Sequence, residues 1–177
     1  MKTRTGLLAM LAALAGCAHS PPTIPPVAQV DVDRFAGRWY VIAHIPSRQE
    51  KDAYNAVETY ARPVDGKIAT TFTFNEGGFD GPPKTMTPTG FVREGTNGAV
   101  WGMQFVWPVK AEYVIVDLAP DYSRTIVGRS KRDYAWIMAR TPTIPDADYA
   151  AALAKLTELG YSLKDLRRVP QRWPATN

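Results

Sequence analysis

The feature of this 177-residue chain that most limits its fold is a succession of short strand-like runs between residues 37 and 141. The runs are rich in β-branched and aromatic residues, and turn residues such as Gly66 and Gly98 lie between them. Eight strands are predicted, at about 37–46, 54–63, 67–75, 84–94, 99–107, 112–118, 124–130 and 133–141. Because no helical pattern separates these runs, consecutive strands are expected to pair antiparallel.

The run at 99–107 indicates what the sheet encloses. Every second position carries a large apolar side chain on the same face of the strand: Trp101, Met103, Phe105 and Trp107. The run at 133–141 repeats the pattern with Tyr134, Trp136 and Met138. Eight antiparallel strands can close around an apolar interior wide enough for one small ligand. The predicted fold is all-β: an eight-stranded antiparallel up-and-down β-barrel.

One amphipathic α-helix is predicted to follow the strands and to pack on the barrel. Thr143 is the expected N-cap, Pro145 suits the first turn, and Gly160 is the expected end. Apolar residues recur between them at helical spacing, at Tyr149, Leu153, Leu156 and Leu159. A short edge strand is predicted within 163–170.

The N-terminus predicts export. Lys2 and Arg4 precede an uncharged apolar run at 5–15 that is too short to span a bilayer. Leu14-Ala15-Gly16-Cys17 then resembles the lipobox of bacterial lipoproteins, in which the chain is cut before a lipidated cysteine. That resemblance makes Cys17 the lipidation site. Ala18 after it implies a periplasm-facing lipid anchor in the outer membrane. The alternative is an ordinary secretion signal with an incidental cysteine.

Four segments are therefore expected: a signal peptide at 1–16, a lipidated cysteine with a proline-rich tether at 17–30, the barrel domain at 31–171, and a tail at 172–177. Removing Lys2 and Arg4 with the signal lowers the formal charge from +4 to +2. No dense basic cluster remains, so nucleic acid is not an expected partner. Once Cys17 is lipidated, no thiol is left for a disulfide, a zinc site or a nucleophile.

Three motifs on these strands resemble those of lipocalins. Gly37 and Trp39 form the Gly-x-Trp motif on the first strand. Asp121-Tyr122 follows the sixth strand and resembles the family's Thr-Asp-Tyr motif with proline in place of threonine. Arg140 ends the eighth strand, where the family stacks an arginine on the motif tryptophan. The whole pattern is most similar to bacterial outer-membrane lipoprotein lipocalins related to apolipoprotein D. The resemblance implies structural roles for these five residues at the closed end of the barrel.

Positions in phase with Trp39 or Arg140, and the large apolar face of the fifth strand, are the candidates for a ligand cavity. They are Val41, Ala43, Trp101, Met103, Phe105, Tyr134, Trp136 and Met138. Tyr113, Tyr134 and Gln104 are candidate hydrogen-bonding partners for a ligand's head group. Lys110, expected in a loop, is a candidate partner for an anionic group.

The remaining polar residues predict little chemistry. His44 is out of phase with Trp39 and is expected outside the barrel. Glu58 and Asp117 are single carboxylates that an exposed face explains. No metal, cofactor or nucleophile–base pair is predicted.

The resemblance implies a non-catalytic carrier that stores or transports fatty acids or lysophospholipids for membrane maintenance. Its partners would be a small amphiphilic ligand and, through the anchor, the membrane. The alternatives are a lipid- or isoprenoid-modifying enzyme built on the barrel, and an interaction module that acts as a homodimer.

Overall fold

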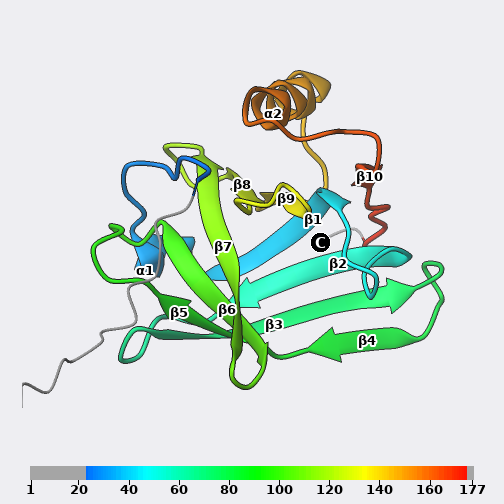
Figure 1. Cartoon of the computed structure of the whole chain (residues 1–177). Helices are drawn as coiled ribbons and strands as arrows, with labels where there is room; N and C mark the ends of the chain where they lie inside the picture. Colours follow the sequence, from blue (N-terminus) through cyan, green and yellow to red (C-terminus); the bar gives the residue numbers. More distant parts are fainter. Residues whose placement is uncertain (1–22, 175–177) are drawn as a thin grey trace, which may run out of the picture.

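The computed structural model describes residues 23–174, so Cys17 and the predicted signal peptide lie outside the described residues. In chain order the elements are α1 (Val32–Phe35), β1 (Gly37–Ile45), β2 (Ala53–Tyr60), β3 (Lys67–Glu76), β4 (Pro83–Met86), β5 (Thr89–Val92), β6 (Val100–Val106), β7 (Val109–Leu118), β8 (Arg124–Gly128), β9 (Ala135–Ala139), α2 (Asp146–Glu158) and β10 (Arg167–Arg168) (Figure 1).

The strands form a closed antiparallel barrel. The order β1-β2-β3-β5-β6-β7-β8-β9 returns to its start because β1 also pairs with β9. β4 and β5 follow each other along β3 and together fill one strand position. The predicted eight-stranded barrel is therefore confirmed. β10 lies within the predicted edge segment and pairs with β1 outside the closed circuit.

The fourth predicted strand is divided in two. β4 ends at Met86 and β5 begins at Thr89, with Pro88 between them. Proline has no N–H to donate to a ladder, but its carbonyl still accepts a hydrogen bond from the Thr70 N–H of β3 (3.0 Å).

α2 packs on the outside of the barrel, beside β9 and β1 (Figure 1). Ala152, Leu156 and Leu159 are buried there against the outward-facing side chains of the strands. The predicted Thr143 cap is wrong: the N-cap is Pro145, with no side-chain capping bond, and the Thr143 carbonyl accepts a bond from the Thr141 hydroxyl. Over residues 23–174, no helix is long and apolar enough to cross a membrane.

The segment at 23–30 is bound to the barrel and is not a free tether. Ile24 is fully buried, the Val27 N–H donates to the Ile115 carbonyl (2.9 Å), and the Val30 N–H donates to the Asn97 carbonyl (2.8 Å). The prediction of a spacer is therefore wrong for these residues, and residues 17–22 of it lie outside the described part.

Candidate ligand-binding site

One end of the barrel is sealed by α1, Trp39 and Arg140. The Arg140 guanidinium carbon lies 3.8 Å from the centre of the buried Trp39 ring, which is a cation–π contact. The same guanidinium donates to the carbonyls of Arg38 (2.8 Å), Arg34 (2.9 Å) and Ala36 (3.0 Å). It therefore ties α1 to the start of β1 and satisfies backbone carbonyls at this end of the barrel.

The other motif residues lie at this same end. Tyr122 has a positive φ of 62°, its ring faces the Arg34 guanidinium at 4.0 Å, and its hydroxyl accepts from the Asp31 N–H (2.9 Å). The Asp121 carboxylate accepts from the Ser123 N–H (3.0 Å) and closes the turn. Gly37 has φ +99°, and a Cβ there would lie 3.3 Å from Arg140 Nη1. All five motif residues thus lie at the sealed end of the barrel.

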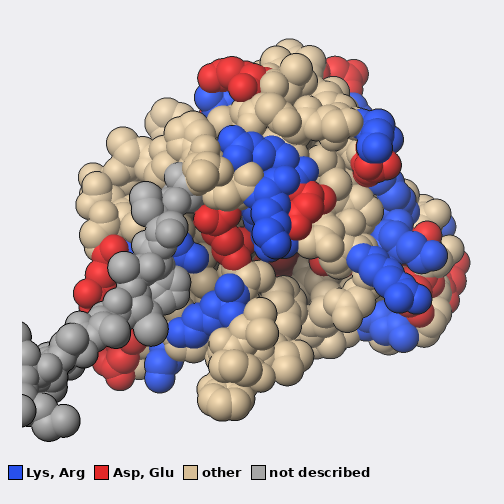
Figure 2. Space-filling view, viewed as in Figure 1, with Lys and Arg blue, Asp and Glu red and all other residues tan. Residues whose placement is uncertain are grey.

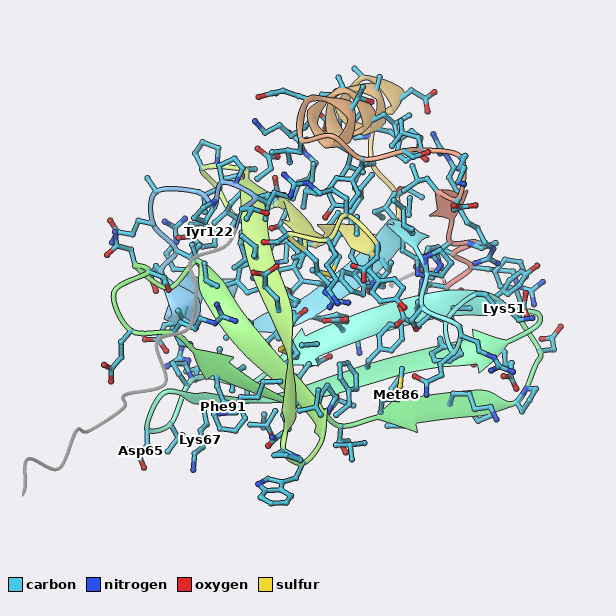
Figure 3. All side chains as sticks on the ribbon, viewed as in Figure 1. Lys51, Asp65, Lys67, Met86, Phe91 and Tyr122 are labelled. Carbon is cyan, nitrogen blue, oxygen red and sulfur yellow. The ribbon has the colours of Figure 1, made fainter. Side chains whose placement is uncertain are left out.

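A cavity of about 260 Å³ opens at the opposite end. Lys51, in the β1–β2 loop, and Tyr122, beside α1, mark the two ends (Figure 3). The wall combines many apolar side chains with a few charged ones: Ser47, Gln49, Glu50, Glu58, Phe72, Met86, Pro88, Met103, Phe105, Ala111, Glu112, Tyr113, Arg129, Tyr134 and Trp136.

The predicted cavity residues divide into three groups. On the cavity wall lie Met103, Phe105, Tyr113, Tyr134 and Trp136. Deeper in the barrel core lie Val41, Trp101 and Met138, where Trp101 stacks on Tyr113 with ring centres 5.0 Å apart. Ala43 is outside the barrel, in the cluster under α2. The prediction that Ala43 lines the cavity is wrong.

A bulge in β1 explains both Ala43 and His44. The β1–β9 register shifts between Val41 and Ala43, so Ile42 and Ala43 both contribute to the outer cluster. The extra residue reverses the alternation, and His44, expected outside, is fully buried with Nδ1 3.6 Å from Glu50 Oε2.

Two polar candidates on the β6–β7 hairpin do not line the cavity. Gln104 lies between the wall residues Met103 and Phe105 on β6, so its side chain is on the opposite face of the strand. Lys110 lies on β7, not in a loop, and its ammonium group sits 3.5 Å from the centre of the Phe91 ring. Trp107, expected on the inner face, is 82% exposed at the hairpin tip.

Sequence reasoning missed a chain of hydrogen bonds inside the barrel. Glu58, expected on an exposed face, lines the cavity and accepts a hydrogen bond from the Tyr60 hydroxyl. The Tyr60 hydroxyl is also 2.6 Å from that of Tyr113. Either of the two hydroxyls can donate in this second bond. The only signal for this in the sequence is that Glu58 shares a strand face with Tyr60.

The protonation of this chain follows from its surroundings. Loss of water contact inside the barrel raises the pKa of Glu58 to about 8, and the nearby charge of Glu50 adds to the shift. Burial, followed by the Glu58 charge, raises the pKa of Tyr113 well above 10. Near neutral pH, Glu58 is therefore mostly a neutral acid with a proton to donate.

Glu50 behaves in the opposite way. Burial raises the pKa of this carboxyl, but the side chains of His44, Ser47 and Trp136 together outweigh burial and lower it. Ser47 Oγ donates to one Glu50 oxygen (2.7 Å) and Trp136 Nε1 to the other (3.0 Å). Glu50 is therefore a fixed negative charge that holds the β1–β2 loop against the cavity wall. Among residues 23–174, no three His, Cys, Asp or Glu side chains gather to hold a metal.

The rim of the cavity is ordered by a second carboxylate. Glu112 accepts from the Ser130 N–H (2.6 Å) and hydroxyl (3.0 Å), which fixes the β8–β9 loop. Arg129 in that loop lines the cavity and lies 3.3 Å from Asp133. A positively charged side chain, Arg129, and a negatively charged one, Glu112, therefore both lie at the opening of the cavity.

A β-barrel that is sealed at one end and has a largely apolar cavity at the other belongs to the small-molecule-binding barrels. The sequence matches the Lipocalin-like domain model over residues 30–171, so this chain belongs to the lipocalin family. The resemblance carried by the three motifs is confirmed.

The chain has relatives in plants and bacteria. Temperature-induced lipocalin-1 of Arabidopsis thaliana is 30% identical over 82% of this chain and 81% of that protein. Outer membrane lipoprotein Blc of Escherichia coli K12 is 30% identical over 92% of this chain and 94% of the Blc chain.

Solved structures share the fold at lower identity. Insecticyanin of the tobacco hornworm Manduca sexta gives a TM-score of 0.64 at 18% identity, covering 84% of each chain. Lobster apocrustacyanin A1 gives a TM-score of 0.61 at 15% identity, and the match covers 85% of this chain and 91% of the apocrustacyanin chain.

Proposed function

We propose that this protein binds a fatty acid or a lysophospholipid and carries it without changing it chemically. The observation that carries the proposal is the one-ended cavity, whose wall is largely apolar. Phe72, Met86 and Met103 supply apolar surface for an acyl chain. A volume of about 260 Å³ suits a single slender chain better than a broad ring system.

The charges at the opening favour a head group that carries both signs. Arg129 can pair with a phosphate or a carboxylate, and Glu112 with an ammonium group. A fatty acid uses only the first of these contacts. A lysophospholipid with an amine in its head group uses both, so it is the preferred ligand.

The site of action is proposed to be the periplasmic side of the outer membrane. Support comes from the lipobox-like sequence ending at Cys17 and from relatives named outer membrane lipoprotein Blc. A lipid anchor there would keep the cavity close to the bilayer that supplies poorly soluble ligands.

The enzyme alternative has one observation in its favour. A carboxyl with a pKa of about 8, bonded through Tyr60 to Tyr113, can exchange a proton with a bound lipid near neutral pH. Mass spectrometry of a lipid incubated with the protein distinguishes the two functions, because a carrier returns its ligand unchanged.

The test of the carrier function is a calorimetric titration of the soluble chain with lysophosphatidylethanolamine and with a fatty acid. Saturable binding of one lysophospholipid per chain is expected, with weaker binding of the fatty acid. Ala111→Phe places a ring on the cavity wall and should weaken binding at least about tenfold.

Val64→Phe is the matched control. Val64 is 69% exposed in the loop between β2 and β3, at the sealed end, so this variant should bind like the wild type. Saturable binding of neither lipid would refute the proposal.

A further inference from the structure

The hairpin between β6 and β7 exposes an unusual amount of apolar surface. The exposed fractions of its side chains are 55% for Phe105, 72% for Val106, 82% for Trp107 and 69% for Val109. Over residues 23–174 the only other large apolar side chains that are exposed are Val64 and Trp173. A cluster of this kind, with Pro108 in its centre and no charge from 105 to 109, marks an interaction surface.

This hairpin stands beside the opening of the cavity. Phe105, on the strand entering the tip, and Ala111, on the strand leaving it, both line the cavity. The hairpin extends beyond the neighbouring strands (Figure 1) and forms an uncharged projection at the bottom of the space-filling view (Figure 2). Whatever covers the tip therefore also faces the cavity's mouth.

The described chain begins at this same end of the barrel. The Thr23 N–H donates to Ser130 Oγ (2.9 Å), and Arg132 Nη1 donates to Thr23 Oγ1 (3.1 Å), both in the β8–β9 loop at the rim. From Thr23, residues 23–30 run along the barrel toward the sealed end, where the Val30 N–H donates to the Asn97 carbonyl.

The predicted anchor cannot lie far from this point. Five residues, 18–22, separate Cys17 from Thr23. Even fully extended, the stretch from Cys17 to Thr23 spans at most about 20 Å. A lipid on Cys17 would therefore hold the mouth, not the floor, next to the membrane.

The charges around the mouth suit a membrane surface. Arg48 and Lys51 in the β1–β2 loop are exposed, and so is Lys131 in the β8–β9 loop. Cations around the mouth attract anionic lipid head groups, while the apolar side chains of the hairpin enter the interface. Trp107 is a residue type that prefers this interfacial depth.

We propose that the β6–β7 hairpin inserts into the lipid bilayer interface, so that the cavity opens onto the membrane. Trp107, Pro108 and Val109 form the inserted tip. An acyl chain can then pass between the bilayer and the cavity along Phe105 with little exposure to water. The orientation deepens the proposed carrier function, but the hairpin's affinity for lipid depends on neither the ligand nor the anchor.

The test uses the chain from residue 17 onward carrying Cys17→Ser, so that neither a covalent lipid nor the apolar run at 5–15 contributes. It is mixed with vesicles of phosphatidylethanolamine and a minority of phosphatidylglycerol, and bound protein is separated by flotation. We expect measurable binding, and quenching of tryptophan fluorescence by vesicles with brominated acyl chains. The double variant Trp107→Ser/Val109→Ser should bind at least about tenfold more weakly and lose most of the quenching.

Val109→Ser and Val64→Ser form a matched pair. Both valines are 69% exposed, but they lie at opposite ends of the barrel. Only Val109→Ser should weaken vesicle binding. Equal effects of the two, or no vesicle binding by the Cys17→Ser chain, would overturn the proposal. So would a concentration-dependent dimer that the double variant abolishes, because a second copy would then cover the tip.

Ligand titration in solution separates this proposal from the carrier function. The double variant should keep the wild-type Kd for lysophosphatidylethanolamine, because neither Trp107 nor Val109 lines the cavity. Vesicle binding without ligand binding would refute the carrier function alone, and ligand binding without vesicle binding would refute the insertion alone.

Discussion

At the scale of single residues, Glu58 shows how position in the barrel changes chemistry. Its side chain is half-buried, and it faces a cavity deep inside the molecule. Strand pairing places it opposite Trp39 and Phe72, two members of the inner core. A carboxyl in such surroundings holds its proton to higher pH than one in water. Near neutral pH the cavity therefore contains one protonated carboxyl group, Glu58, and one ionised carboxyl group, Glu50.

The raised pKa of Glu58 predicts that stability falls as pH rises. The folded state holds the proton up to a pKa of about 8, whereas the unfolded chain releases it near 4.5. This contribution to the free energy of unfolding is complete below pH 4.5 and is lost progressively up to about pH 8. Because the half-buried side chain keeps some contact with water in the cavity, the effect is smaller than for a fully buried group. We expect the free energy of unfolding to fall by about 2 kcal/mol over this pH range.

Glu58→Gln tests this, since glutamine keeps the size and the acceptor for Tyr60 but cannot ionise. Urea unfolding at several pH values between 5 and 8 should show a smaller decline for the variant than for the wild type. Parallel declines would contradict the assignment. Asp117→Gln, at a half-buried strand position outside the cavity wall, should leave the wild-type decline in place.

At the scale of elements, the bulge in β1 decides which side chains face the ligand. Trp39 and Val41 follow the alternation expected of a strand. One extra residue at Ile42-Ala43 then sends His44 inward to Glu50. Neither residue is a glycine or proline, so no local signal marks the bulge. It arises from how β1 pairs with β9 across the closure of the barrel.

The two faces of the barrel wall predict that stability and binding can be separated. Leu156 on α2 is fully buried in the outer cluster and touches no part of the cavity. Leu156→Ala should lower the free energy of unfolding by about 2–5 kcal/mol. The Kd for lysophosphatidylethanolamine should stay unchanged, because the inner wall is intact. Thermal unfolding and calorimetry on the same samples measure both.

Thr157→Ala serves as the comparison, since Thr157 is exposed on the same helix. It should change the free energy of unfolding by less than about 0.5 kcal/mol. A loss of ligand affinity in Leu156→Ala would mean that α2 and the cavity are coupled through the wall.

At the scale of the whole molecule, the N-terminal segment connects the two ends of the barrel. Its residues 23–30 run from the rim to the sealed end and bury Ile24 on the way. Since this part is docked, residues 23–30 cannot act as the predicted spacer. The direction in which the chain leaves the barrel then sets how the cavity would face a membrane.

Replacing Cys17 by Ser should convert a stably anchored protein into a reversibly bound one. After a high-pH carbonate wash of membranes from expressing cells, the wild type should stay in the pellet. The Cys17→Ser protein should be released, because a hairpin at the interface binds far more weakly than two or more acyl chains. Its lysophosphatidylethanolamine Kd should equal that of the wild type. Equal retention of both proteins would argue against lipidation at Cys17.

The sequence by itself determined the barrel, the helix beside it and the sealed end. These follow from local alternation, turn residues and three motifs, each of which can be found without knowing what lies across the barrel. It also placed Met103 and Trp136 on the inner face, because their strands keep regular alternation up to those positions.

Only the tertiary structure decided which polar groups enter the cavity and what holds the N-terminal segment. Ala43 and His44 exchanged faces at a bulge, Glu58 faced inward with Tyr60, and Trp107 emerged at a hairpin tip. Each outcome depends on closure of the sheet, on contacts between strands distant in sequence, or on where a strand turns. Alternation along a single strand carries no information about those contacts, so their chemistry appears only once the barrel is closed.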